Sequence, residues 1–174
     1  MARATCEKLI SRHPHLFADQ TAQSSEEVMG RWEEIKRVEK GQATISQAME
    51  EVARSLPATW RSEKVQAKAA KVGFDFPNPS GALEKLQEEV LEVEKALPQG
   101  GKELEEEIGD VLFAAINLAR MAGVDPEVAL NQSTDKFMKR FSYLEEKITK
   151  AGKTFETLSL DEMEAIYQEG KNRL

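Results

Sequence analysis

Apolar residues recur every three or four positions along most of this chain, the spacing of a helix face that packs against a core. In residues 81–97 these positions are Leu83, Leu86, Val90, Val93 and Leu97. Residues 102–122 and 126–151 continue the same period, and no segment alternates with a period of two for long enough to indicate a strand. We therefore expect an all-α fold, an antiparallel helical bundle with short loops.

Glycine, proline and capping residues mark the ends of the expected helices. Ser24 is expected to open a helix through Lys40, and the stretch from Gly41 to Ser46 is expected to be loose. Pro57 suits the first turn of a helix that runs to about Val72. The remaining expected boundaries are a helix 2–12 that stops at His13-Pro14-His15, Ser80 as the cap of 81–97, Gly123 and Gly152 as helix ends, and a Ser159–Glu162 capping box for a last helix to about 172.

Composition and charge restrict the class of protein. The 174 residues suffice for one domain with an appendage or for one elongated helical domain, and 40% of them are hydrophobic. The net charge of −7 offers no basic surface for a nucleic-acid polymer, and the longest apolar run, 111–124, is too short to span a membrane. A single cysteine, Cys6, excludes an internal disulfide and fits a reducing compartment. We expect a cytoplasmic protein with neither nucleic-acid polymer nor membrane as a partner.

Acidic residues are concentrated in two segments, 87–94 and 103–110. Glu89 and Glu92 are three residues apart, as are Glu107 and Asp110, so each pair shares one face of its helix. Glu106 and Asp110 are four apart and are also neighbours. The short turn between the two helices makes them antiparallel, so both sets can converge on one site. Carboxylate ligands alone suit Mg²⁺, or Mn²⁺, better than zinc.

Acid-rich helices are more often solvated faces, and two features favour a metal site over that interpretation. Asp110 stands in the otherwise apolar run Ile108 to Phe113, where burying an unpaired carboxylate would be costly. Gly109 is unfavourable in a helix interior, by about 1 kcal/mol relative to alanine. We therefore expect a half-buried acid at Asp110 and a close approach of another group at Gly109.

A di-iron bundle is the competing metal site, but it requires Glu-x-x-His on two helices. The two histidines, His13 and His15, flank a proline at a helix end, far from the acidic segments. That alternative fails.

Lys136 and Arg140 are four residues apart on the third helix, and Lys85 precedes Glu89 by four. These cations are either surface charge or a clamp on phosphates, and spacing alone leaves both open. Lys139, one position before Arg140, is expected to point away from the face that Lys136 and Arg140 share.

With these residues in place, the chain resembles the MazG-type nucleoside triphosphate pyrophosphohydrolases of the all-α NTP pyrophosphatase group. The motif of that family is Glu-x-x-Glu, a spacer, then Glu-x-x-Asp. Here it is Glu89-x-x-Glu92, fourteen residues, then Glu107-x-x-Asp110. The resemblance extends over nearly the whole chain through further segments, among them 12–17, 54–58, 72–75, 117–120 and 136–141.

The resemblance implies metal-dependent hydrolysis of nucleoside triphosphates to monophosphates and pyrophosphate. Four helices around so polar a site leave a modest core, so we expect a second chain to complete the bundle in a homodimer. The resemblance also implies the metal ligands Glu89, Glu92, Glu107 and Asp110, with Glu106 as a fifth. It implies Glu88 or Glu89 as the base that takes the proton of the attacking water. It also implies substrate binding by Lys85, Asn117, Lys136, Arg140 and Tyr167, the last standing where relatives can have tryptophan.

Two-domain members of the family carry the motif twice, and an echo between residues 5–12 and 134–140 fits the end of a missing first copy. The resemblance thus divides the chain into a remnant at 1–20, a helical connector at 21–56 and a catalytic domain at 57–174. Two other functions stay open at this point. One is a helical module that binds nucleotide or protein without turnover, and the other is the same chemistry on a related substrate such as dUTP or phosphoribosyl-ATP.

Overall fold

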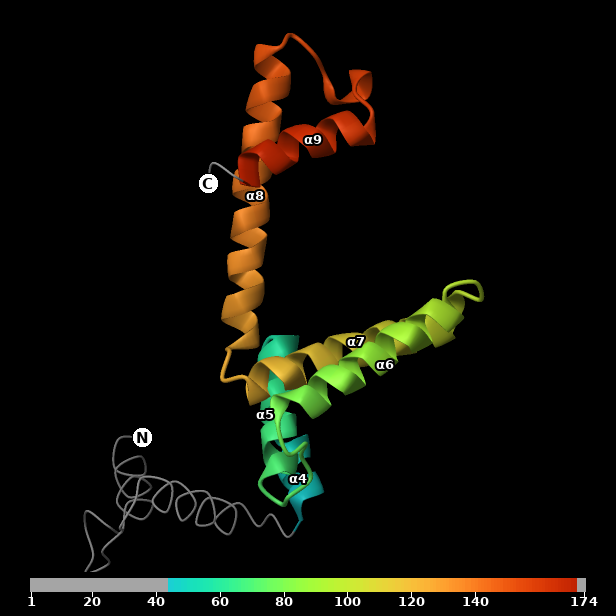
Figure 1. Ribbon diagram of the computed structural model, residues 1–174. Helices are drawn as coiled ribbons and strands as arrows, with labels where there is room; N and C mark the ends of the chain where they lie inside the picture. Colours follow the sequence, from blue (N-terminus) through green and yellow to red (C-terminus); the bar gives the residue numbers. More distant parts are fainter. Residues whose placement is uncertain (1–43, 172–174) are drawn as a thin grey trace, which may run out of the picture. The chain divides into compact units, whose positions relative to one another are not determined.

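The computed structural model describes residues 44–171, and all of its regular elements are helices (Figure 1). They are α4 (Ile45–Glu50), α5 (Ala58–Ala70), α6 (Pro79–Ala96), α7 (Gly101–Met121), α8 (Pro126–Lys150), the 3₁₀ turn η1 (Phe155–Thr157) and α9 (Leu160–Lys171). Residues 44–171 contain no strand, so the expected all-α fold is confirmed. The expected helices 2–12 and 24–40, the remnant 1–20 and the histidine pair lie outside the described residues.

These residues belong to two compact units that divide between Asp75 and Phe76. The first contains α4 packed against α5, and the second contains α6 to α9. In the second unit α6 packs along α7, joined by a short turn, and α8 packs against α9. The α6–α7 hairpin is the part of the fold that positions the acidic segments. None of the helices between residues 44 and 171 is both long enough and apolar enough to cross a bilayer.

The start of α6 differs by two residues from the expectation, because Asn78 rather than Ser80 caps the helix. The side-chain oxygen of Asn78 accepts hydrogen bonds from the backbone N–H of Ser80 at 3.0 Å and of Gly81 at 3.3 Å. Pro79 occupies the first helical position, where its lack of an N–H costs nothing. The segment Asn78-Pro79 therefore contains the complete start signal, and Ser80 lies inside the helix.

Helix α4 was not expected, since the stretch up to Ser46 had been taken as loose. Thr44 and Gln47 form a capping box: the Gln47 N–H donates to Thr44 Oγ1 at 3.2 Å, and the Thr44 N–H donates to Gln47 Oε1 at 3.1 Å. This Thr-x-x-Gln pattern is the signal that could have revealed the helix. The capping box of Ser159 and Glu162 is confirmed.

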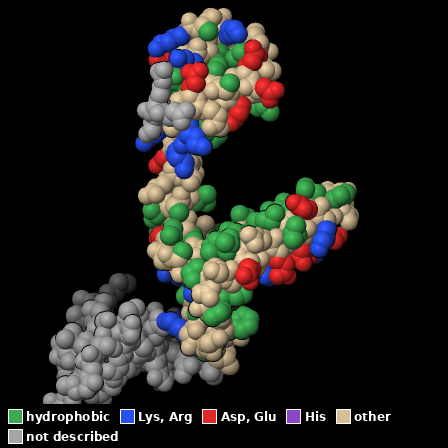
Figure 2. Space-filling model, viewed as in Figure 1, with side chains coloured by type: hydrophobic (Ala, Val, Ile, Leu, Met, Phe, Trp, Pro, Cys, Tyr) green, Lys and Arg blue, Asp and Glu red, His purple; other side chains and the backbone are tan. Residues whose placement is uncertain are grey.

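Small residues dominate the interior of the α6–α7 hairpin. The buried apolar side chains there are Ala82, Ala96 and Ala114, whereas in the α8–α9 pair Leu144 and Ile148 are buried. Much of the expected apolar stripe stays exposed: Leu97 retains 58% and Leu112 61% of their accessible surface. Hydrophobic side chains accordingly gather on the surface of the hairpin (Figure 2). The hairpin by itself therefore buries only part of the apolar surface that its sequence provides.

Candidate metal centre

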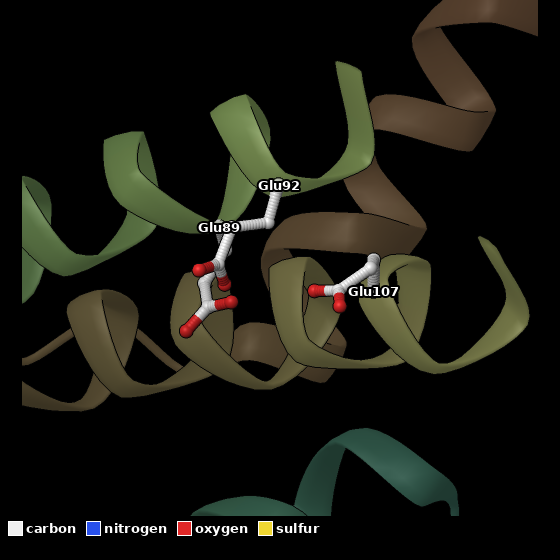
Figure 3. Close-up of side chains that lie close together, drawn as sticks. All are labelled: Glu89, Glu92 and Glu107. Carbon is white, nitrogen blue, oxygen red and sulfur yellow. The ribbon is translucent and has the colours of Figure 1, made fainter. Parts of the chain in front are cut away.

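Helices α6 and α7 bring three of the expected ligands to one point. Glu89, Glu92 and Glu107 each offer a carboxylate oxygen, and these oxygens all lie within 4.8 Å of one another (Figure 3). Glu89 and Glu92 are less than one helical turn apart on α6, and Glu107 faces them from α7. The packing of two antiparallel helices thus converts two short motifs into one cluster.

Glu89 is the buried member of this cluster, with 6% of its surface exposed. Its Oε1 lies 2.7 Å from the Nζ of Lys85, one turn earlier on α6. The hydrogen bond from Lys85 lowers the pKa of the Glu89 carboxyl, although burial acts in the opposite direction. The same contacts with Glu89 and Glu88 raise the pKa of Lys85. Lys85 therefore keeps one buried carboxylate ionised.

Glu92 behaves in the opposite way. Its hydrogen bond with Glu89 is the main reason that its pKa is raised, followed by loss of water and by the negative charges of Glu89 and Glu107. With Lys85 as the neighbouring cation, ionisation of Glu92 beside an ionised Glu89 is thus unfavourable. A divalent cation would remove that cost, and a set of oxygen ligands alone fits Mg²⁺ or Mn²⁺. The residues present therefore fit a hard divalent metal.

Two further expected ligands do not belong to this group of three. Glu106 is exposed, and its Oε1 lies 3.5 Å from the Nζ of Lys102. Asp110 follows Glu107 by three residues on α7, but it is exposed rather than half-buried as expected. The expected close approach at Gly109 is also wrong, because a Cβ placed there would have no described atom within 4 Å. The apolar neighbours of Asp110 on α7, Ile108, Leu112 and Phe113, are themselves exposed, so the Asp110 carboxylate is not desolvated.

The expected phosphate-binding cations of α8 line one hollow of about 280 Å³. Lys136 and Arg140 share it with Lys139, which helical spacing had placed on another face. Lys139 follows Lys136 by three residues, and this spacing brings both to the same side of the helix. The Nε of Arg140 is buried and has no hydrogen-bond partner in the described part of the chain. Gln132 and Asp135 complete the lining of the hollow, so three cations stand beside one carboxylate, and the net positive charge suits an anion.

The other expected site residues lie away from the three glutamates or at their edge. Glu88 is exposed, and its Oε1 lies 2.9 Å from the Nζ of Lys85. Asn117 accepts hydrogen bonds from the Arg120 guanidinium at 2.8 and 3.1 Å. It follows Glu107 by ten residues, roughly 15 Å along α7.

Tyr167 of α9 is half-buried, and its ring centroid lies 5.8 Å from that of Phe137 on α8. Phe137 in turn stacks on Phe141, which stacks on Phe155. Tyr167 thus belongs to an aromatic group that joins α8, η1 and α9. Its ring has a packing role in this chain whatever else it contacts.

The α6–α7 hairpin lies within a segment of the chain that matches a known protein family. Residues 78–144, which hold all of α6 and α7 and most of α8, match the MazG nucleotide pyrophosphohydrolase domain. The chain is 40% identical over 174 residues to the nucleoside triphosphate pyrophosphohydrolase of Escherichia coli K12, covering 98% of this chain and 66% of that protein. It is also 40% identical over 169 residues to the nucleoside triphosphate pyrophosphohydrolase/pyrophosphatase MazG of Thermotoga maritima, covering 97% of this chain. The chain spans 66% and 64% of the length of these two relatives.

Divalent metal is expected to raise the melting temperature in a concentration-dependent way, since binding to the folded state alone stabilises it by about 2.7 kcal/mol at a hundredfold excess over Kd. The double substitution Glu92→Gln with Glu107→Gln should abolish this response to Mg²⁺ or Mn²⁺. It leaves the ion pair between Lys85 and the buried Glu89 intact, so the metal-free protein should melt no lower than the wild type. Differential scanning calorimetry with and without metal measures both effects.

The matched control is Glu94→Gln with Glu105→Gln, which removes one exposed carboxylate from each of the same two helices. It should keep the full metal response. An equal loss of response in both double variants would mean that the ions bind through general surface charge.

Proposed function

Because this chain belongs to the MazG nucleotide pyrophosphohydrolase family, we propose that it hydrolyses nucleoside triphosphates to nucleoside monophosphates and pyrophosphate. The observation that carries the proposal is the convergence of Glu89, Glu92 and Glu107 within 4.8 Å, inside the matched residues 78–144. Three carboxylates this close together repel one another unless cations neutralise them. The names of the two bacterial relatives support the same reaction.

The proposed cofactor is Mg²⁺, or Mn²⁺, held by these three glutamates with Asp110 as a fourth ligand and Glu106 in reserve. Bound metal would polarise the α-phosphoryl oxygen and lower the pKa of water. Asp110 lies three residues after Glu107, and its exposure leaves its carboxylate open to a ligand on that side of α7. Lys85 holds Glu89 ionised, which is the state in which that side chain binds a cation.

In the proposed reaction a water oxygen attacks the α-phosphorus, the bond from that phosphorus to the bridging oxygen breaks, and pyrophosphate leaves. Glu88 or Glu89 accepts the proton of the water. Glu88 is the better placed of the two, because it is exposed and stands outside the group of three while contacting the same lysine. Lys136 and Arg140 stabilise the charge that develops on pyrophosphate. Asn117 and Tyr167 complete the proposed substrate-binding set.

We also propose that two copies of the chain pair through the exposed apolar faces of α6 and α7. A contiguous apolar surface of this kind is typical of an interface. The exposed large side chains of these helices are Leu83, Val90, Leu91, Ile108, Leu112 and Phe113. Pairing would bury them and would supply the core that the alanine-rich hairpin lacks.

The first test of the activity is pyrophosphate release from a panel of ribo- and deoxyribonucleoside triphosphates with Mg²⁺, dUTP and phosphoribosyl-ATP included. We expect turnover that chelation by EDTA abolishes. Asp110→Asn keeps the shape of the side chain and deletes its charge, so kcat/KM should fall at least about tenfold while the helical circular dichroism stays unchanged. No release from any nucleotide would support a non-catalytic module instead, and an Asp110→Asn variant within about twofold of wild type would remove Asp110 from the ligand set.

Arg140→Ala tests the proposed clamp on the phosphates. A charge-assisted contact contributes about 1.5–3 kcal/mol, so KM for nucleoside triphosphates should rise about tenfold or more. Lys150→Ala is the control, since Lys150 is on the same helix, is exposed and pairs with Glu146 rather than lining the hollow. Lys139 cannot serve as the control because it lines the same hollow. Equal effects of the two substitutions would point to net charge rather than a clamp.

The proposed dimer predicts a solution mass of twice the 19.5 kDa of one chain. Leu112→Lys places a charge in the proposed interface and should shift the mass towards the monomer in sedimentation velocity. Leu160→Lys changes a leucine on α9 that is still more exposed, 75% against 61%, and lies outside those faces, so it should not shift the mass. A monomeric wild-type chain would overturn this part of the proposal.

A further inference from the structure

One carboxylate lies among the cations of the hollow on α8, and the proposed reaction gives it no role. The hollow is lined by Gln132, Asp135, Lys136, Lys139 and Arg140. All five come from one stretch of a single helix, at separations that bring their side chains to the same side. Asp135 is exposed and stands outside the group of three glutamates, so the proposed metal site does not account for it.

Asp135 does not neutralise these cations by direct contact. It precedes Lys139 by four residues, the spacing at which ion pairs form along a helix. Even so, none of the ion pairs among residues 44–171 includes any of the four charged residues of the hollow. An anion in the hollow would therefore meet three positive charges and one negative charge at the same time.

The chemistry of the proposed reaction makes this negative charge matter more for the product than for the substrate. Within the triphosphate, one bridging oxygen joins the α-phosphorus to the β-phosphorus. When its bond to the α-phosphorus breaks, this oxygen becomes a terminal oxygen of pyrophosphate and carries negative charge. Three cations therefore attract pyrophosphate more strongly than the same two phosphate groups of the substrate. A neighbouring carboxylate repels that additional charge and offsets part of the attraction.

We propose that Asp135 promotes the release of pyrophosphate, because its negative charge weakens the attraction of Lys136, Lys139 and Arg140 for the product. The inference rests on the proposed hydrolysis of nucleoside triphosphates and adds a residue for the step that follows bond breaking. It also gives Lys139 a place beside the other two cations in binding pyrophosphate. Product release limits kcat in many enzymes, so weaker binding at this point favours turnover.

The test measures binding of inorganic pyrophosphate to the full chain by isothermal titration calorimetry in EDTA, so that no metal at the glutamates holds the probe. Asp135→Asn keeps the shape of the side chain and removes its charge, so it should tighten binding at least about threefold at low ionic strength. Lys139→Ala should weaken binding by a similar factor. The effect of Asp135→Asn should shrink in about 1 M salt, where the Debye length is about 3 Å.

Two further variants separate the charge at this position from net charge and from altered packing. Asp135→Glu keeps the charge and should bind pyrophosphate like the wild type. Glu145→Gln removes an exposed carboxylate from the same helix, nine residues after Lys136 and thus on the opposite side of α8, and it should also bind like the wild type. Equal tightening by Asp135→Asn and Glu145→Gln would overturn the role of Asp135. No tightening by Asp135→Asn, or no binding by either it or the wild type, would overturn the role as well.

Kinetics test the consequence for turnover. In Asp135→Asn, pyrophosphate should inhibit hydrolysis at concentrations lower by the factor seen in calorimetry, and kcat should fall while KM does not rise. A fall in kcat without tighter binding of pyrophosphate would show a different role for Asp135 and overturn the inference. Because calorimetry needs no turnover, it decides the binding relation even for an inactive chain. Absence of pyrophosphate release from every nucleotide would instead count against the proposed function.

Discussion

Repulsion among Glu89, Glu92 and Glu107 is the interaction that the α6–α7 hairpin has to accommodate. Their oxygens lie within 4.8 Å of one another, and within residues 44–171 only Glu89 of the three forms an ion pair with a lysine. Lys85 stabilises the ionised form of Glu89, while the hydrogen bond with Glu89, followed by loss of water and the charges of Glu89 and Glu107, raises the pKa of Glu92. The packing of α6 against α7 supplies the free energy that keeps the acids together. Helix packing, rather than attraction among the three carboxylates, therefore holds the cluster together.

That packing is unusual in using little large apolar surface. Ala82, Ala96 and Ala114 are the buried apolar residues of the hairpin, and alanine gains little free energy on burial. Several of the larger apolar residues of the same helices, among them Leu91 and Leu112, are exposed. The hairpin that must offset the repulsion among the carboxylates therefore leaves much of its apolar surface exposed to water. The proposed dimer would bury that surface. Assembly and metal binding would then draw on the same two helices.

The sequence predicted the helices and the central part of the site because both depend on local spacing. Glu89 with Glu92 and Glu107 with Asp110 were identified by the three-residue step of a helix face, and the short turn at residues 97–100 required the two faces to meet. Errors arose where tertiary environment decides. Asp110 was expected to be half-buried from its apolar neighbours, but those neighbours point away from this chain's core. Lys139 was assigned to another face, although it lines the hollow of Lys136 and Arg140. The helix starts at Thr44 and Asn78 follow from side-chain chemistry, because Thr44 forms a capping box with Gln47 and Asn78 caps a helix that begins with Pro79.

The position of Lys85 also determines which ions can enter the cluster. An ammonium group already holds Glu89 at 2.7 Å, so an arriving cation exchanges with a positive charge that is tethered to the protein and has no translational freedom to lose. A monovalent ion brings no more charge than that ammonium and must give up part of its own hydration, so the exchange gains little. A divalent ion brings one additional positive charge, which would offset the negative charges of Glu89 and Glu107 that help to raise the pKa of Glu92. The ammonium of Lys85 would thus compete with any cation for the Glu89 carboxylate and disfavour ions of a single charge. Monovalent salt would then leave the cluster available to a divalent metal.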